Sequence, residues 1–293
     1  MSQSFKTNYA IIAVVLSVLA LSFGDAIIKL TGLALPLWQM YILRSMIALP
    51  MLLIITRFRK PTPMTSFFWV ILRSLLLVVM WLCYYSSLNL VALSTAAAAY
   101  YTAPIFIALF ATIASHKVPG LYVWFACTLG FFGVLLIVRP DETNFQWTIF
   151  LPILAAILYA VAMVLTSIKC KNDDPITLSI TLNVAFIVSG ILLALFSGST
   201  DSYLFGQWQP LNSALIGTIA ILAIVIVVGS VGAAIAYQNG PPATIAIFDY
   251  VYLLFSLIWG VLFFAHTPNI TELVGILAIA AAGYTVISKT QTP

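Results

Sequence analysis

Long hydrophobic runs separated by short polar segments follow one another along the chain. Each run is close to the roughly 20 residues that an α-helix needs to cross the hydrocarbon core of a bilayer, and proline, glycine and charged residues mark its ends. We predict ten such spans, at residues 9–30, 37–56, 66–88, 93–114, 120–138, 147–166, 175–196, 213–236, 243–263 and 270–288. The pattern predicts an all-α integral membrane protein with ten transmembrane helices.

The composition agrees with a chain that lipid surrounds. Of the 293 residues, 63% are hydrophobic and 7% are charged, whereas soluble domains carry about 25% charged residues. The first hydrophobic run, from Tyr9 to Lys29, is longer than the core of a signal peptide, so we expect it to remain as the first helix. The net charge of +4 is scattered over short loops, which argues against a nucleic-acid partner.

Basic residues gather on one side of the predicted spans. That side holds Lys6, Arg57, Arg59, Lys60, Lys117, Lys169, Lys171 and Lys289, whereas the opposite side holds only Lys29 and Arg139. Cytoplasmic loops of membrane proteins carry an excess of lysine and arginine. We therefore predict that both chain termini lie in the cytoplasm.

The two halves of the chain resemble each other weakly. At an offset of 150 residues the matches are Ser94 with Thr244, Tyr100 with Tyr250, His116 with His266, Gly133 with Gly283 and Ile137 with Ile287, and at an offset of 139 they are Pro36 with Pro175 and Arg44 with Asn183. We predict one five-helix repeat in residues 1–140 and a second in residues 147–293. Because five is an odd number, the second repeat is inverted, and the substrate site is expected near the midplane between the repeats.

Ionisable residues inside the spans are the first candidates for a functional site, because inserting one costs about 2.5 to 3.5 kcal/mol. The guanidinium of Arg44 can bind a substrate carboxylate or pair with an acid. Arg73 lies close enough to the end of its span to snorkel to the interface, and we favour that structural role. Asp25 precedes Lys29 by four residues, which favours an ion pair that either anchors the helix or faces a cavity.

Asp249 is the second acidic candidate within the spans. On a regular helix it shares a face with Tyr252 and Ser256, where it can hold a substrate ammonium group, pair with an arginine, or carry protons. Together with Asp25 it is our candidate for proton coupling. Asn183 occupies the repeat position of Arg44, which favours a central location and a place in the cavity wall.

Aromatic residues line one stripe of the third span. Its members recur at spacings of three and four: Arg73, Leu77, Trp81, Tyr84 or Tyr85, Leu88 and Asn89. Such a stripe suits a ring-bearing amphipathic ligand, although tryptophan and tyrosine also form interfacial belts and pack helices.

Further cavity-lining candidates come from other spans. They are Tyr101 in the fourth, Tyr159 and Met163 in the sixth, and Tyr252 in the ninth, and helix packing explains them nearly as well. Pro104 is predicted to kink the fourth span and is our candidate for a gate.

Several function classes lack the residues that they need. The sequence contains no phosphate-binding Walker loop, no HExxH zinc motif and no paired acids or nucleophile with a base, so we expect no catalytic residues and no cofactor. His116 and His266 fall on opposite sides of the membrane, so they cannot share a metal ion. A secondary transporter that uses alternating access remains, ahead of an intramembrane enzyme and of a receptor.

Two segments carry a resemblance to a known family. Residues 90–110, LVALSTAAAAYYTAPIFIALF, place small residues before a mid-helix proline, and residues 240–260, GPPATIAIFDYVYLLFSLIWG, are their counterpart. In these segments the chain resembles the drug/metabolite transporter superfamily, in its ten-helix branch with a duplicated EamA-type repeat. The resemblance implies two inverted five-helix repeats that carry small molecules through a central cavity. Where relatives often have a Gly-Glu pair, this chain has Ser115-His116 and Ala265-His266.

Within that superfamily, the aromatic content and the run from Phe248 to Tyr252 are most similar to the YddG-type aromatic amino acid exporters of bacterial inner membranes. The resemblance implies export of aromatic or other neutral amino acids and related amphipathic metabolites across the inner membrane, and efflux of cationic drugs is the alternative. The glycines of the fifth and tenth spans, including Gly133 and Gly275, suit close helix packing or a dimer contact, so a monomer and a homodimer both remain open.

Overall fold

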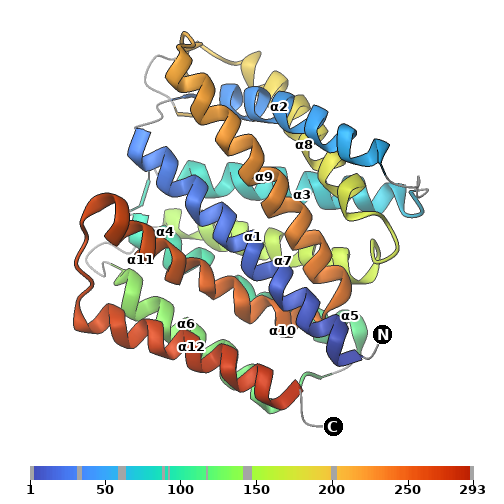
Figure 1. Ribbon diagram of the computed structural model, residues 1–293, viewed down its shortest axis with the longest axis vertical. Coiled ribbons are helices and arrows are strands. Elements are labelled where there is room, and N and C mark those ends of the chain that lie inside the picture. Colours follow the sequence, from blue (N-terminus) through green and yellow to red (C-terminus); the bar gives the residue numbers. More distant parts are fainter. Residues whose placement is uncertain are drawn as a thin grey trace.

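The computed structural model describes residues 3–31, 35–58, 64–87, 90–91, 93–116, 118–140, 147–198 and 203–290. These residues form helices and no strand (Figure 1): α1 (Gln3–Thr31), α2 (Leu37–Arg57), α3 (Phe67–Ser87), α4 (Leu93–Tyr100), α5 (Ala103–Ser115), α6 (Leu121–Val138), η1 (Trp147–Ile149), α7 (Phe150–Ile168), α8 (Pro175–Ala194), α9 (Ser213–Asn239), α10 (Pro242–Ile247), η2 (Phe248–Tyr250), α11 (Val251–Phe264) and α12 (Ile270–Thr290).

Ten helical segments within the described residues are long and apolar enough to cross a membrane, which confirms the ten predicted spans. The chain is therefore a multi-pass membrane protein. Five residues named above lie outside the described residues: Arg59, Lys60, Leu88, Asn89 and Lys117.

Two of the ten spans carry a local irregularity, where turn or 3-10 hydrogen bonds replace the α-helical pattern while the backbone stays in the right-handed helical region, and we call them broken spans. The fourth span divides into α4 and α5 at Tyr101 and Thr102, and Pro104 lies in the first turn of α5, where the missing N–H of proline is tolerated. The ninth span divides into α10, η2 and α11, and the short 3-10 segment η2 contains Asp249. The position for which a kink is predicted, Pro104, thus directly follows a local irregularity of the helix at Tyr101 and Thr102.

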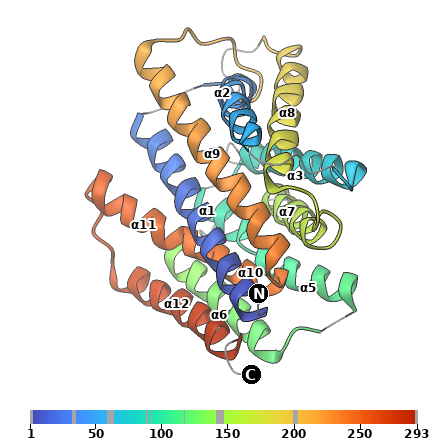
Figure 2. The same cartoon turned by 45° about the vertical axis from the view of Figure 1, so that its right-hand side comes forward.

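The most extensive helix contacts join the first half of the chain to the second. They are the pairs α1 with α9, α3 with α7, α2 with α8 and α6 with α12, which lie side by side in Figures 1 and 2. These pairs follow the order of the spans. If the first five spans are exchanged with the last five, in order, the pair α1–α9 becomes the pair α7–α3, while the pairs α2–α8 and α6–α12 are exchanged with themselves. The two halves are therefore interleaved, and each depends on the other for burial of its helices.

Glycines let α6 and α12 approach closely. A Cβ atom added at Gly133 would lie 2.7 Å from the carbonyl oxygen of Gly275, and one added at Gly275 would lie 2.7 Å from that of Gly133. Close backbone contact through glycine is a common way to pack helices in lipid, where no hydrophobic effect drives them together. The predicted packing face at these two glycines therefore joins helices of the same chain.

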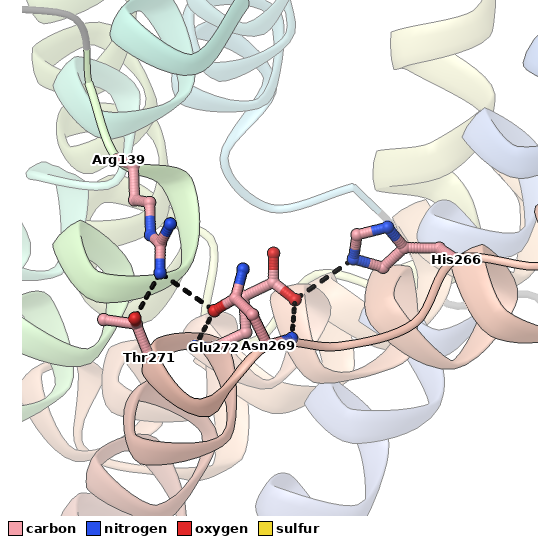
Figure 3. A network of polar contacts seen from close by, with 5 residues as sticks. All are labelled: Arg139, His266, Asn269, Thr271 and Glu272. Carbon is pink, nitrogen blue, oxygen red and sulfur yellow. Dashed lines mark hydrogen bonds and ion pairs between the residues drawn. The ribbon is translucent and has the colours of Figure 1, made fainter.

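A polar network ties α6, α11 and α12 together at one end of the bundle (Figure 3). Arg139 donates to Asn269 Oδ1 at 2.9 Å and to the hydroxyl of Thr271. Asn269 and Glu272 bond each other's backbone N–H groups at 3.0 Å, which makes a capping box at the start of α12. His266 lies 3.1 Å from the Glu272 carboxylate. This network satisfies N–H groups that the first turn of a helix leaves unpaired.

We predict that Gly275→Ala lowers the free energy of unfolding by about 1 to 3 kcal/mol, because the new methyl group collides with the Gly133 carbonyl. Thermal unfolding of the purified protein in detergent measures the effect. Gly217→Ala is the matched control, since a Cβ at this position of α9 meets nothing within 4 Å, and it should leave the melting temperature unchanged or raise it. A melting temperature of Gly275→Ala at or above that of the wild type would contradict the contact.

Candidate functional site

A small cavity with a mostly apolar wall and two charged side chains lies between α1, α2, α3 and α9. Its walls include Asp25 and Ile28 from α1, Arg44 from α2, Trp81 and Tyr85 from α3, and Leu222 from α9. Its volume is about 20 Å³, which is room for about one water molecule. The cavity therefore brings two opposite charges and two aromatic rings together, and it can enclose an organic solute only if the surrounding helices separate.

Arg44 is the unusual group of this cavity. Its Nε and Nη2 atoms are buried and have no hydrogen-bond partner in the described structure. The guanidinium lies over the ring of Phe186, at 4.9 Å from the centroid, and 5.9 Å from that of Tyr41. Contacts with ring faces attract a cation but satisfy none of its N–H donors. Arg44 therefore keeps donors available for an acceptor from outside the protein, such as a carboxylate.

Asp25 is exposed and accepts a hydrogen bond from the hydroxyl of Tyr252 in α11. Lys29 lies over the ring of Phe264, with Nζ 4.6 Å from the centroid. The predicted ion pair between Asp25 and Lys29 is therefore wrong. The reason is that α11 packs against α1 and offers both side chains a closer partner.

Asp249 is buried in the broken ninth span. Its Oδ2 atom accepts hydrogen bonds from Tyr237 at 2.7 Å and from Tyr159 at 3.2 Å. Neither an arginine nor a lysine pairs with it among the described residues. The shared face of Asp249 and Tyr252 stays a prediction: residues three apart in a 3-10 segment lie on the same side, and here the two side chains bond different partners, Tyr237 and Tyr159 for Asp249 and Asp25 for Tyr252.

Aromatic rings connect the cavity to Asp249. Successive contacts run from Trp81 to Tyr85 at 5.2 Å, Tyr85 to Tyr84 at 6.0 Å, Tyr84 to Tyr100 at 5.1 Å, and Tyr100 to Tyr159 at 6.0 Å between ring centroids. A branch leads from Tyr100 through Tyr101 to Tyr252, at 5.8 and 6.0 Å. Of the candidate residues, Asp25, Arg44, Trp81 and Tyr85 line the cavity. Tyr84 and Tyr252 contact residues of its wall, and Tyr101, Tyr159 and Asp249 are connected to it only through further tyrosines.

Three other residues lie outside the cavity wall. Met163 is 1% exposed and packs in the main hydrophobic core. Asn183 is fully buried, and its Nδ2 donates to Ser179 O at 2.9 Å. Arg73 is 1% exposed, and its Nε donates to Thr166 Oγ1 at 2.9 Å. The predicted snorkelling of Arg73 is therefore wrong, because α7 and α8 pack over α3 and close its path to the interface.

Sequence reasoning missed the segment from Tyr203 to Gln209. The backbone N–H of Leu37 donates to Tyr203 O at 2.8 Å, and Trp38 Nε1 donates to Gly206 O at 2.9 Å, which fastens this segment to the start of α2. The Tyr203 ring lies 5.8 Å from that of Tyr85, and burial raises the pKa of Tyr203 to about 12. A single tyrosine in a polar loop carries no sequence signal for such a position beside the cavity.

Polar contacts also close the opposite end of the bundle. Near the end of α9, Gln238 Nε2 donates to Cys170 O at 2.6 Å and to Asp173 O at 2.8 Å. The Asp173 carboxylate accepts from the backbone of Thr65 at 2.6 Å, ahead of α3. Cys170 is fully buried, and this burial raises the pKa of its thiol to about 11. At this end the Asp173 carboxylate therefore joins the two halves of the chain.

Comparison with known proteins gives one family and two curated relatives. The model of the EamA-like transporter family matches residues 8–139 and again residues 146–288. A protein of Rhizobium johnstonii named riboflavin transporter is 25% identical over 167 residues, 57% of this chain and 52% of the relative. A protein of Vibrio cholerae serotype O1 with the same name is 26% identical over 165 residues, 55% of this chain and 52% of the relative. The chain thus spans about half the length of these curated relatives in the match.

A solved structure titled only as the crystal structure of a protein superposes with a TM-score of 0.77, over 97% of this chain and 96% of that one. Its sequence identity of 15% means that the likeness concerns the fold alone. The YddG-type subgroup of exporters stays a prediction, since the two relatives carry a different name.

We predict that Arg44→Met raises the free energy of unfolding in the absence of substrate. Replacing a buried cation whose donors are unpaired by an apolar side chain removes its desolvation penalty, which the contacts with ring faces offset only in part. Arg73→Met is the matched control and should lower stability, because it removes the bonds that Arg73 donates to Thr166 and to the carbonyl of Leu178. Melting temperatures in detergent compare the two, and a loss of stability in both variants would contradict the unpaired state of Arg44.

Proposed function

The chain belongs to the EamA-like transporter family, and we propose that it exports aromatic or other neutral amino acids across the bacterial inner membrane. One observation carries the proposal: a guanidinium with free donors, a carboxylate and aromatic rings share one cavity. The donors of Arg44 bind the substrate carboxylate, and the rings of Trp81 and Tyr85 bind the substrate side chain. The site binds and releases its substrate without covalent chemistry.

Alternating access of two inverted repeats is the transport mechanism that we propose. Three observations support residues 1–140 and 147–293 as these repeats: the family model matches each half once, the main helix contacts survive exchange of the halves, and each half has one broken span. Rocking of one half against the other opens the small cavity to one side at a time. The predicted excess of basic residues supports cytoplasmic termini.

Flavin transport is the second candidate function. The observation that favours it is the name of the two curated relatives, both riboflavin transporters. A flat flavin ring also suits the aromatic wall of Trp81 and Tyr85. A neutral flavin, however, leaves Arg44 and Asp25 without charged partners, so the cavity favours an amino acid.

Counterflow in proteoliposomes tests these candidates directly. Vesicles loaded with unlabelled tryptophan should accumulate labelled tryptophan, and they should accumulate labelled riboflavin or a cationic dye at least about tenfold more slowly, the ratio that 1.4 kcal/mol of binding energy gives. Faster accumulation of riboflavin would replace the amino acid by a flavin, and faster accumulation of the dye would favour drug efflux.

We predict that Trp81→Ala and Tyr85→Ala each reduce tryptophan flux by about fivefold, since loss of one aromatic contact in a desolvated site costs about 1 kcal/mol. Initial rates at equal protein content measure the effect. Trp147→Ala is the matched control, because Trp147 is 81% exposed and lies outside the cavity. Unchanged flux in both cavity variants would remove these rings from the site.

We predict that Asp249→Asn abolishes the response of transport to a pH gradient. Asp249 is a buried carboxylate whose partners, Tyr159 and Tyr237, carry no positive charge, so it can exchange a proton during the cycle, whereas asparagine cannot. Flux is measured with and without an imposed gradient. Asp174→Asn is the control, since asparagine also caps a helix. A full response in Asp249→Asn would leave this residue a packing role.

A further inference from the structure

We propose that the ammonium group of a zwitterionic amino acid displaces the Tyr252 hydroxyl from Asp25, and that this displacement releases α11 from α1. The inference rests on the proposed function and deepens it in two ways. It names the substrate class as one that carries a carboxylate and an ammonium group together. It also names the contact through which substrate binding moves a broken span.

The two charged side chains of the cavity, Arg44 and Asp25, differ in their hydrogen bonding. Arg44 has two buried donors without a partner, while Asp25 holds one neutral donor, the phenol of Tyr252. Both residues line the same hollow, and the free donors of Arg44 are not bonded to Asp25. A ligand whose anionic and cationic groups are joined at one carbon atom satisfies both at once.

Replacement of the phenol by an ammonium group is energetically favourable. The phenol offers the carboxylate a neutral donor, whereas an ammonium group adds the Coulomb attraction of an opposite charge to its hydrogen bond. A carboxylate can also accept bonds at about four positions, and among the described contacts Asp25 accepts from Tyr252 alone. Asp25 is exposed, so an incoming ligand can reach it before the cavity widens.

Tyr252 is well placed to transmit this exchange. It lies in the first turn of α11, directly after η2, and its ring contacts Tyr101 at the break of the fourth span, with 6.0 Å between centroids. Release of its hydroxyl therefore affects both broken spans. A ligand shifts a conformational equilibrium only through interactions that differ between the states, and the bond between Asp25 and Tyr252 is such an interaction.

The rest of the α1–α11 contact can separate without leaving a buried charge. It includes the bond from Trp259 Nε1 to Ser22 Oγ at 3.1 Å, the packing of Phe23 on Trp259 at 5.2 Å, and the approach of Lys29 to Phe264. Asp25 is the sole carboxylate in these described contacts. In the empty protein the phenol thus holds α1 and α11 together, and the substrate loosens them.

Counterflow of three related compounds into wild-type proteoliposomes is the first test. Tryptophan carries both charged groups, tryptamine lacks the carboxylate, and indole-3-propionate lacks the ammonium group. We expect tryptophan to exchange at least about tenfold faster than either analogue, since each leaves one cavity charge unmatched. Equal exchange of tryptophan and indole-3-propionate would overturn the role of Asp25.

Variants of the contact supply the second test. Tyr252→Phe keeps the ring and removes the competing hydroxyl, so the half-saturation concentration for tryptophan should fall about tenfold, because a hydrogen bond to a charged group no longer has to break. Asp25→Asn should erase the preference for tryptophan over indole-3-propionate. Tyr250→Phe is the matched control, since its hydroxyl donates to Cys127 O at 3.3 Å and does not touch Asp25.

Different results would contradict the transport function and the displacement of Tyr252. If wild-type protein exchanges none of the amino acids, the proposed function is wrong. If wild-type protein exchanges tryptophan but Tyr252→Phe and Tyr250→Phe have the same half-saturation concentration as wild type, the displacement is wrong and the transport function stands.

Discussion

Hydrocarbon offers no hydrogen bonds, and the described structure follows from this constraint. Backbone groups pair inside helices, and hydroxyl groups within the spans donate to carbonyls one turn earlier, as Ser74 does to Val70 and Thr112 to Ala108. Hydrophobicity cannot hold helices together in lipid, so close backbone contact does, as between Gly133 and Gly275. Ionisable side chains within the spans that are not paired inside their own helix mark the places where function is expected.

The polar groups that are not paired within their own helix lie at or near the contact between the two halves of the chain. Arg44 leaves donors unpaired, Asp25 and Asp249 are held by phenols, and two spans break beside these residues. Interleaving explains the arrangement, because helices of the first half pack mainly on helices of the second. Any motion of one half against the other must therefore rearrange these contacts. In the function that we propose, this site between the halves both binds the ligand and responds to the relative position of the halves.

Aromatic side chains, mostly tyrosines, dominate the contact region between the two halves. Tyrosine combines a large apolar ring with one hydroxyl, so a ring-to-ring series can fill space, remain in lipid-like surroundings and still pair with carboxylates at its ends. Tyr159 and Tyr237 serve Asp249 in this way, and Tyr252 serves Asp25. A neutral hydroxyl holds a carboxylate weakly enough for a charged ligand or a proton to replace it, which a lysine or arginine in the same place would prevent.

The sequence by itself determined the ten spans, an irregularity of the fourth span next to Pro104 and the candidacy of Arg44, Asp25, Trp81 and Asp249, because these follow from span length, proline chemistry and the cost of burying charge. Only the tertiary structure decided the partners. Arg73 snorkels on an isolated helix but is covered by α7 and α8, and Asp25 pairs with α11 rather than with Lys29. Periodicity describes one helix at a time, whereas partners depend on which helix packs against it, and that is set by contacts between residues more than 200 positions apart.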